Sequence, residues 1–161
     1  MGGWFYRGQS DSEWGLVPNE NRFPYYDENG FDFKFKMWLK HSHNYPNMKF
    51  SNDIEAMAIA QHHGFPTKLL DWSSNILTAT FFACASNFDK DGKLITYFPT
   101  QYIYLGDDLS SVEISRVVGY QPKAVAERLK TQSGYFTYHK EQRFKIVNEY
   151  FRPGNHETLM E

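Results

Sequence analysis

Apolar residues at helical spacing mark an amphipathic segment early in the chain. Phe31, Phe35, Trp38 and Leu39 recur every three or four positions, and lysines stand between them. This spacing puts the apolar side chains on one face of an α-helix. The pattern predicts a helix over 31–44.

A second helix is predicted over Asp53–His63. Ile54, Met57 and Ala58 share one face of this segment. Ser51 or Asn52, just before it, is a typical N-cap, because a short polar side chain there accepts a hydrogen bond from the first turn.

A third helix is predicted over Ile76–Ala85, with Ser74 or Asn75 as its N-cap. The segment is apolar almost all round, which is typical of a buried helix. Cys84 lies within this apolar run, and we expect it to be a small core residue.

Short runs of aromatic and β-branched residues predict the strands. The first is expected to place Arg7 at its end, and Asp91-Gly92 is typical of a hairpin turn leading into the third. A short helix is also expected over 124–130, and 106–123 shows no clear pattern. The predicted strands are Trp4–Tyr6, Thr67–Trp72, Lys93–Phe98, Tyr135–Tyr138 and Phe144–Val147.

This order of elements predicts the fold class. Helices come mainly in the first half and strands mainly in the second, which favours an α+β fold with helices packed on a mixed or antiparallel sheet. The chain has 161 residues, enough for one domain. We expect residues 1–152 to form that domain and residues 153–161 to be a flexible C-terminal tail, because Pro153-Gly154 interrupts regular structure.

Composition narrows the class of protein. A formal net charge of −2 gives no overall basic field for nonspecific nucleic-acid binding. The single cysteine provides neither a disulfide framework nor a thiolate metal site. A basic leader and a long apolar run are both absent, so we expect a cytoplasmic protein with no membrane partner. Aromatic residues make up 18% of the chain, either as core or as a stacking surface for a ligand ring.

Two dense polar clusters flank turns or strands and are the candidate site. The first is Phe5–Gln9, and the second is split by Gly64 and Pro66 into Gln61-His62-His63 and Asp71-Trp72-Ser73. Because glycine and proline interrupt the backbone, we expect the two halves of the second cluster to fold back toward each other. The two clusters are then expected to form two walls of one site.

Arg7 is the strongest candidate for ligand binding. A guanidinium binds phosphate oxygens in a bidentate manner, and Gln9 adds a polar side chain on the same strand face. The alternative is an ion pair that only holds strand and loop together. Asp71 lies in an apolar stretch where an unpaired carboxylate would be costly, so we expect it to pair with Arg7 or Arg22.

His62 and His63 are neighbours and would point about 100° apart on a helix, so we expect no metal site there. One of them is a candidate base or phosphate ligand, and the other is expected to bond the carbonyls at the helix end. Trp72 is expected either to stack on a ligand ring or to pack in the core. Ser73 or Ser74 is a candidate N-cap.

These residues resemble the FRG domain family, named for its Phe/Tyr-Arg-Gly signature. The resemblance begins at Tyr6-Arg7-Gly8-Gln9 and Trp14–Pro18 and continues through Gln61–Ser73 to Phe81-Phe82-Ala83. It extends to Gln132–Thr137. Lys68 and Ser73 stand where the family favours arginine and threonine.

The chain also resembles ADP-ribosyltransferases of the Arg-Ser-Glu type, in which an arginine ends the first strand and a serine precedes a helix. Arg7 and then Ser73 or Ser74 stand in that order, and Gln132 or Glu141 stands where a later glutamate is expected. The resemblance implies an ADP-ribosyltransferase-like fold, with NAD as substrate and a protein or nucleic acid as acceptor. It also implies a place in a toxin, phage or defence system.

The sequence is also consistent with two other functions. The same arginine and aromatic side chains would suit a module that recognises a nucleotide or single-stranded nucleic acid without catalysis. Gln132 would contact an amide, base or ribose, or would only stabilise a turn. The polar signature would also suit a protein-interaction domain in which it only determines the fold.

Overall fold

The computed structural model describes residues 3–22, 24–25, 30–42, 50–104, 107, 109, 117–122 and 134–140. Within these ranges the chain forms helices α1 (Phe31–Ser42), α2 (Asp53–His62) and α3 (Ile76–Cys84), and a 3-10 helix η1 (Asn19–Asn21). The strands are β1 (Phe5–Gln9), β2 (Leu69–Ser73), β3 (Lys93–Tyr97), β4 (Tyr102–Ile103), β5 (Val118–Tyr120) and β6 (Gly134–Tyr138).

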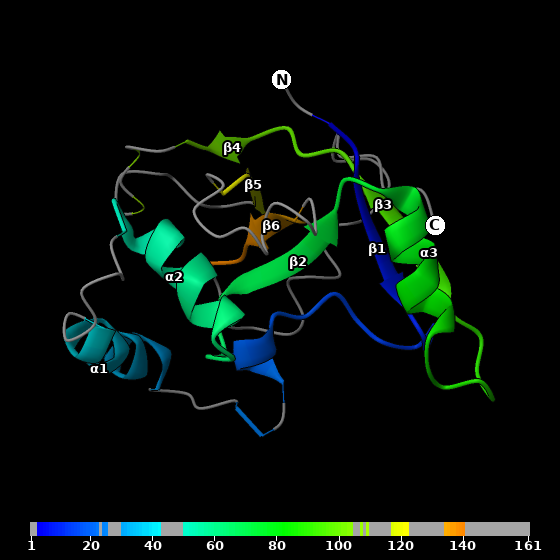
Figure 1. Ribbon diagram of the computed structural model, residues 1–161, viewed down its shortest axis with the longest axis horizontal. Helices are drawn as coiled ribbons and strands as arrows, with labels where there is room; N and C mark the ends of the chain where they lie inside the picture. The colour runs from blue at the N-terminus through cyan, green and yellow to red at the C-terminus, as the bar shows by residue number, and fades with distance from the viewer. Residues whose placement is uncertain are drawn as a thin grey trace.

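The strands form one mixed sheet in the order β3-β1-β2-β6-β5-β4. Neighbours are antiparallel except β4 and β5, which are parallel. Figure 1 shows α1 and α2 on one side of the molecule and α3 alongside β1. The α+β class and the mixed sheet are confirmed, and the described helices all lie before residue 85.

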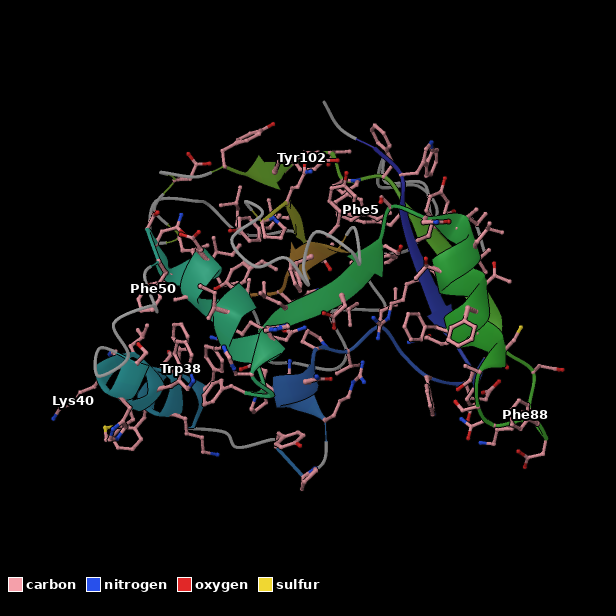
Figure 2. The ribbon with its side chains drawn as sticks, viewed as in Figure 1. Phe5, Trp38, Lys40, Phe50, Phe88 and Tyr102 are labelled. Atoms are coloured by element: carbon pink, nitrogen blue, oxygen red, sulfur yellow. The ribbon has the colours of Figure 1, made fainter. Side chains whose placement is uncertain are left out.

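Side chains on the two faces of the sheet form two apolar clusters. Leu69 packs with α1, α2, β5 and β6, whereas Leu70 and Trp72 pack in a second cluster with Phe5. Successive residues of β2 therefore point to opposite faces, as the pleat of a strand requires. Figure 2 shows Phe5 inside the molecule, where its ring stacks on Tyr135 at 4.4 Å between centroids.

The second helix is capped as its sequence indicates. The Asn52 side chain accepts a hydrogen bond from Glu55 N at 3.0 Å, and Glu55 Oε2 accepts one from Ser51 N at 2.6 Å. This reciprocal pair satisfies two backbone donors at the start of α2. At the other end Gly64 has a φ of +83°, which glycine adopts readily.

The third helix is not buried, contrary to the prediction. Only Ala79 of α3 is buried, whereas Leu77 is 74% exposed and Phe81 is 65% exposed. The helix packs on β1 through its small residues, so close that a Cβ on Gly8 would lie 2.6 Å from Ala83 N. The apolar composition of this segment did not indicate that the helix face carrying its small residues would pack on the sheet. Cys84, expected in the core, is exposed at the end of this helix.

Two strand predictions also need correction. Arg7 lies in the middle of β1 and not at its end, because β1 continues to Gln9 in five register pairs with β3, from Phe5↔Tyr97 to Gln9↔Lys93. Asp91-Gly92 is not a hairpin turn, since a helix precedes it and the partner of β3 is β1. Gly92 instead allows close contact with the carbonyl of Ala83.

Three expectations lie outside the described residues: the helix over 124–130, the strand Phe144–Val147 and the tail 153–161. The undecided region 106–123 contains β5, and the short β4 just before it was not predicted.

Candidate functional site

A split in the sheet positions the candidate site. β1 and β2 share a single register pair, Tyr6↔Ser73, while each pairs with its other neighbour through five. The two strands diverge beyond that pair, as Figure 1 shows. A cleft of about 600 Å³ opens there, between α2 and α3. This volume is typical of a small-molecule site.

The structure brings most of the predicted site residues to this cleft. Its lining includes Tyr6, Arg7, Gln9, His62, Asp71, Trp72 and Ser73. The expectation that Arg7, Gln9, His62 and Asp71 line one pocket is thereby confirmed. His63 is the C-cap of α2 and is not among the lining residues. Gln132 and Glu141 lie outside the described residues.

Arg7 spans the opening between the two diverging strands. Its Nη1 donates a hydrogen bond of 2.6 Å to the backbone carbonyl of Asp71. Its Nε is buried and has no hydrogen-bond partner in the described part of the chain. Burial lowers the pKa of Arg7 to about 10, since Arg22 adds to this effect and Asp71 only partly opposes it. Arg7 therefore remains a cation at neutral pH.

Asp71 is held differently from the predicted ion pair. Its Oδ1 accepts a hydrogen bond of 2.7 Å from Gln61 Nε2, and Arg7 contacts its backbone carbonyl instead of its carboxylate. The side chain is open to the cleft, yet protein atoms crowd around it. This partial desolvation raises the pKa of Asp71, against the opposing attraction of Arg7, the Gln61 hydrogen bond and Arg22.

A chain of buried hydrogen bonds lies beneath Arg7. Trp72 Nε1 donates to Thr137 Oγ1 at 2.8 Å, and Thr137 Oγ1 lies 2.9 Å from His139 Nε2. An indole N–H can only donate, so Thr137 accepts from Trp72. Burial, with a further contribution from Arg7, lowers the pKa of His139 to about 3, so the ring is neutral, and its tautomer decides which of Thr137 and His139 donates to the other. Trp72 is thus fixed in the core beside the cleft.

The remaining predicted residues have mixed surroundings. Gln9 is buried, and its Nε2 donates to Gly15 O at 3.2 Å, while its Oε1 has no partner among the residues described. Ser73 is the last residue of β2, and its Oγ accepts a hydrogen bond from Asn75 N at 3.0 Å. The N-cap of α3 is Asn75, whose side chain bonds Leu77 N. Ser73 therefore orders the strand-to-helix turn without being the cap.

Sequence reasoning did not assign several lining residues to the site. Gln61 belongs to the polar cluster that was singled out, and Arg22 was considered only as a partner for Asp71. Trp14 and Phe82 carry no separate signal, because exposed aromatic side chains such as Phe33 and Phe88 also lie away from the cleft. The lining residues that were not assigned to the site from the sequence include Trp14, Arg22, Gln61, Phe82 and Tyr135.

The cleft combines two guanidinium groups with aromatic walls. Arg7 and Arg22 both line it, and the charge of Arg22 lowers the pKa of Arg7. Two cations facing one cleft suit an anionic ligand, and the aromatic rings provide planar surfaces for a base or another ring. No group of three or more histidine, cysteine, aspartate or glutamate side chains gathers as a metal site in the described ranges. None of the described helices is long and apolar enough to cross a bilayer.

Comparison with known proteins gives one match. The model of the FRG domain matches residues 2–92, more than half of the chain and the part that contains β1, β2 and α3. Neither the curated proteins nor the solved structures contain a match. The matched range includes most of the cleft lining, from Tyr6 to Ser86. The chain belongs to the FRG domain family.

Proposed function

We propose that the cleft binds a nucleotide, NAD or a relative of it. The observation that carries this proposal is the pair Arg7 and Arg22, which face one cleft lined by aromatic side chains. Arginine forks hold phosphate oxygens with charge-assisted hydrogen bonds, and Tyr6 or Phe82 offers a face for a ring. A diphosphate between two heterocycles matches this combination of charge and aromatic surface.

The reaction proposed for this ligand is transfer of ADP-ribose. The bond between ribose C1′ and nicotinamide breaks, and nicotinamide leaves with the bonding electron pair. An acceptor nucleophile on a protein or nucleic acid then attacks C1′ and loses its proton. Arg7 would grip the phosphates, Ser73 would order the turn before α3, and Gln132 or Glu141 would contact the ribose that carries positive charge. The resemblance to Arg-Ser-Glu transferases supports this assignment.

A second function is binding without bond cleavage. Asp71 is the one carboxylate among the described lining residues, and Arg7 and Arg22 offset its charge. A carboxylate neutralised in this way offers little stabilisation to a developing ribose cation. This observation favours a recognition module for a nucleotide or single-stranded nucleic acid.

Calorimetry with NAD and ADP-ribose, run beside an assay for nicotinamide release with protein and nucleic-acid acceptors, tests the proposal. Arg7→Ala should weaken binding about ten- to a hundredfold, the loss expected for a hydrogen bond to a charged group. Lys36→Ala is the matched control: it removes one positive charge from the exposed surface of α1, away from the cleft, and should leave binding unchanged.

Each result has a defined meaning. Binding with slow nicotinamide release supports the transferase, and binding without release supports the recognition module. A large fall in melting temperature for Arg7→Ala would show that Arg7 is a structural clamp. Absence of binding to wild-type protein would refute the nucleotide proposal altogether.

A further inference from the structure

The carboxylate of Asp71 has one oxygen bound and the other available. Oδ1 accepts the hydrogen bond from Gln61 Nε2, the backbone N–H of Asp71 itself also donates to the carboxylate, and no other residue of the described ranges donates to Oδ2. Asp71 lines the cleft from the middle of β2, and its side chain is exposed there. The cleft wall therefore presents a hydrogen-bond acceptor to whatever occupies it.

A second pair of hydrogen bonds fixes which end of Gln61 faces Asp71. Thr67 Oγ1 accepts a hydrogen bond from Leu69 N at 3.1 Å, and a backbone N–H can only donate. The hydroxyl proton of Thr67 is then free to bond Gln61 Oε1, which it contacts. With its oxygen occupied, Gln61 must turn its amide nitrogen toward Asp71. The Gln61 hydrogen bond therefore holds Oδ1 in place, and Oδ2 of the ionised carboxylate can only accept a hydrogen bond.

The nearby cations leave this oxygen available as well. Arg7 donates a hydrogen bond to the backbone carbonyl of Asp71. This hydrogen bond leaves Oδ2 of the Asp71 carboxylate free to accept one from a ligand. A ligand made only of phosphate would bring its oxygens against an acceptor that repels them. A ligand that carries hydroxyl groups next to its phosphates would satisfy both the arginines and Asp71.

We infer that Asp71 accepts a hydrogen bond from a ribose hydroxyl of the ligand, so that the cleft selects a ribose-bearing diphosphate over a bare one. This assignment rests on the proposed nucleotide function and makes Asp71 the residue that determines specificity for the sugar. It differs from a role in which Asp71 only orients Arg7.

Asp71→Asn tests the inference because the sugar role predicts opposite changes for two ligands, whereas loss of a group that only orients Arg7 would weaken the binding of both. Gln61 would still donate to the asparagine oxygen, so the amide nitrogen would face the cleft and replace an acceptor with a donor. Binding of ADP-ribose should weaken about ten- to a hundredfold, because a hydrogen bond to a charged acceptor is lost. Binding of inorganic pyrophosphate should tighten about two- to fivefold, because a negative charge near it is removed.

The experiment is calorimetry of wild type and variant with ADP-ribose and with inorganic pyrophosphate, after melting curves have shown that both are folded. Asp71→Ala serves as a second variant, since it removes the acceptor without adding a donor and leaves no void in the core. A change in the binding of both ligands in the same direction, tighter or weaker, would overturn the sugar assignment while leaving the nucleotide proposal intact. If wild-type protein binds neither ligand, both the proposal and this inference are refuted.

Discussion

Replacement of Glu20 by glutamine is expected to stabilise the fold at neutral and alkaline pH. The Glu20 side chain is 5% exposed, and both of its carboxylate oxygens lack a hydrogen-bond partner among the described residues. Burial raises its pKa from 4.5 to about 7, since the attraction of Lys68 is too weak to offset it and Asp32 adds to the effect. An unpaired buried carboxylate of this kind destabilises the folded state whenever it is ionised.

The size of the effect follows from the two pKa values. Between pH 4.5 and 7 the folded protein binds more protons at Glu20 than the unfolded chain does, so stability falls as pH rises through this window. The shift corresponds to about 3 kcal/mol, at about 1.4 kcal/mol for each pH unit. Glutamine has nearly the same shape and no charge. Glu20→Gln should therefore raise the free energy of unfolding by up to about 3 kcal/mol at pH 8 and by much less at pH 5.

Urea denaturation of wild type and variant at both pH values measures this difference. Glu13→Gln is the matched control, because Glu13 lies on the exposed surface and its replacement should change stability little at either pH. An equal gain at pH 5 and pH 8, or a loss at pH 8, would refute the reasoning. A loss at pH 8 would mean that Glu20 is ionised and favourably paired in the folded protein, and an equal gain at both pH values would mean that the gain does not come from removing its charge.

Two further predictions concern packing. Gly8→Ala should lower the free energy of unfolding by about 1–3 kcal/mol or more, because the new Cβ would collide with the backbone of Ala79 and Ala83. Gly134→Ala is its control, since nothing lies within 4 Å of the corresponding position, and melting curves should separate the two. Leu70→Ala should cost about 2–5 kcal/mol in chemical denaturation, because Leu70 is buried in the cluster beneath β2; a loss below about 1 kcal/mol would contradict this.

Local patterns were sufficient for the elements that local chemistry determines. The Asn52 cap, the apolar face of α2 and the β-preferring run in β3 all depend on residues close together in the sequence. The gathering of Arg7, His62 and Asp71 at one cleft was also predictable, because polar groups beside turns need partners or solvent.

Long-range pairing was not predictable in the same way. The split between β1 and β2 depends on where a ladder stops, and neither strand carries a local signal for that point. For the same reason Arg7 was placed at the end of a strand and the Asp71 carboxylate was paired with an arginine, whereas Gln61 holds it. The exposure of α3 follows from its small residues facing Gly8, and the apolar character of the segment as a whole does not reveal which side faces the sheet.

The exposed position of Cys84 has a practical consequence. It is the single cysteine of the chain and ends α3, with Phe82 and Ser86 of the cleft lining on either side of it in sequence. Residues two apart on a helix point about 200° apart, so a thiol-reactive dye or spin label at Cys84 would point away from Phe82 and leave the cleft open. One probe at one known position, attached to the natural sequence, would then report movement of the end of α3 on ligand binding by fluorescence or by electron paramagnetic resonance.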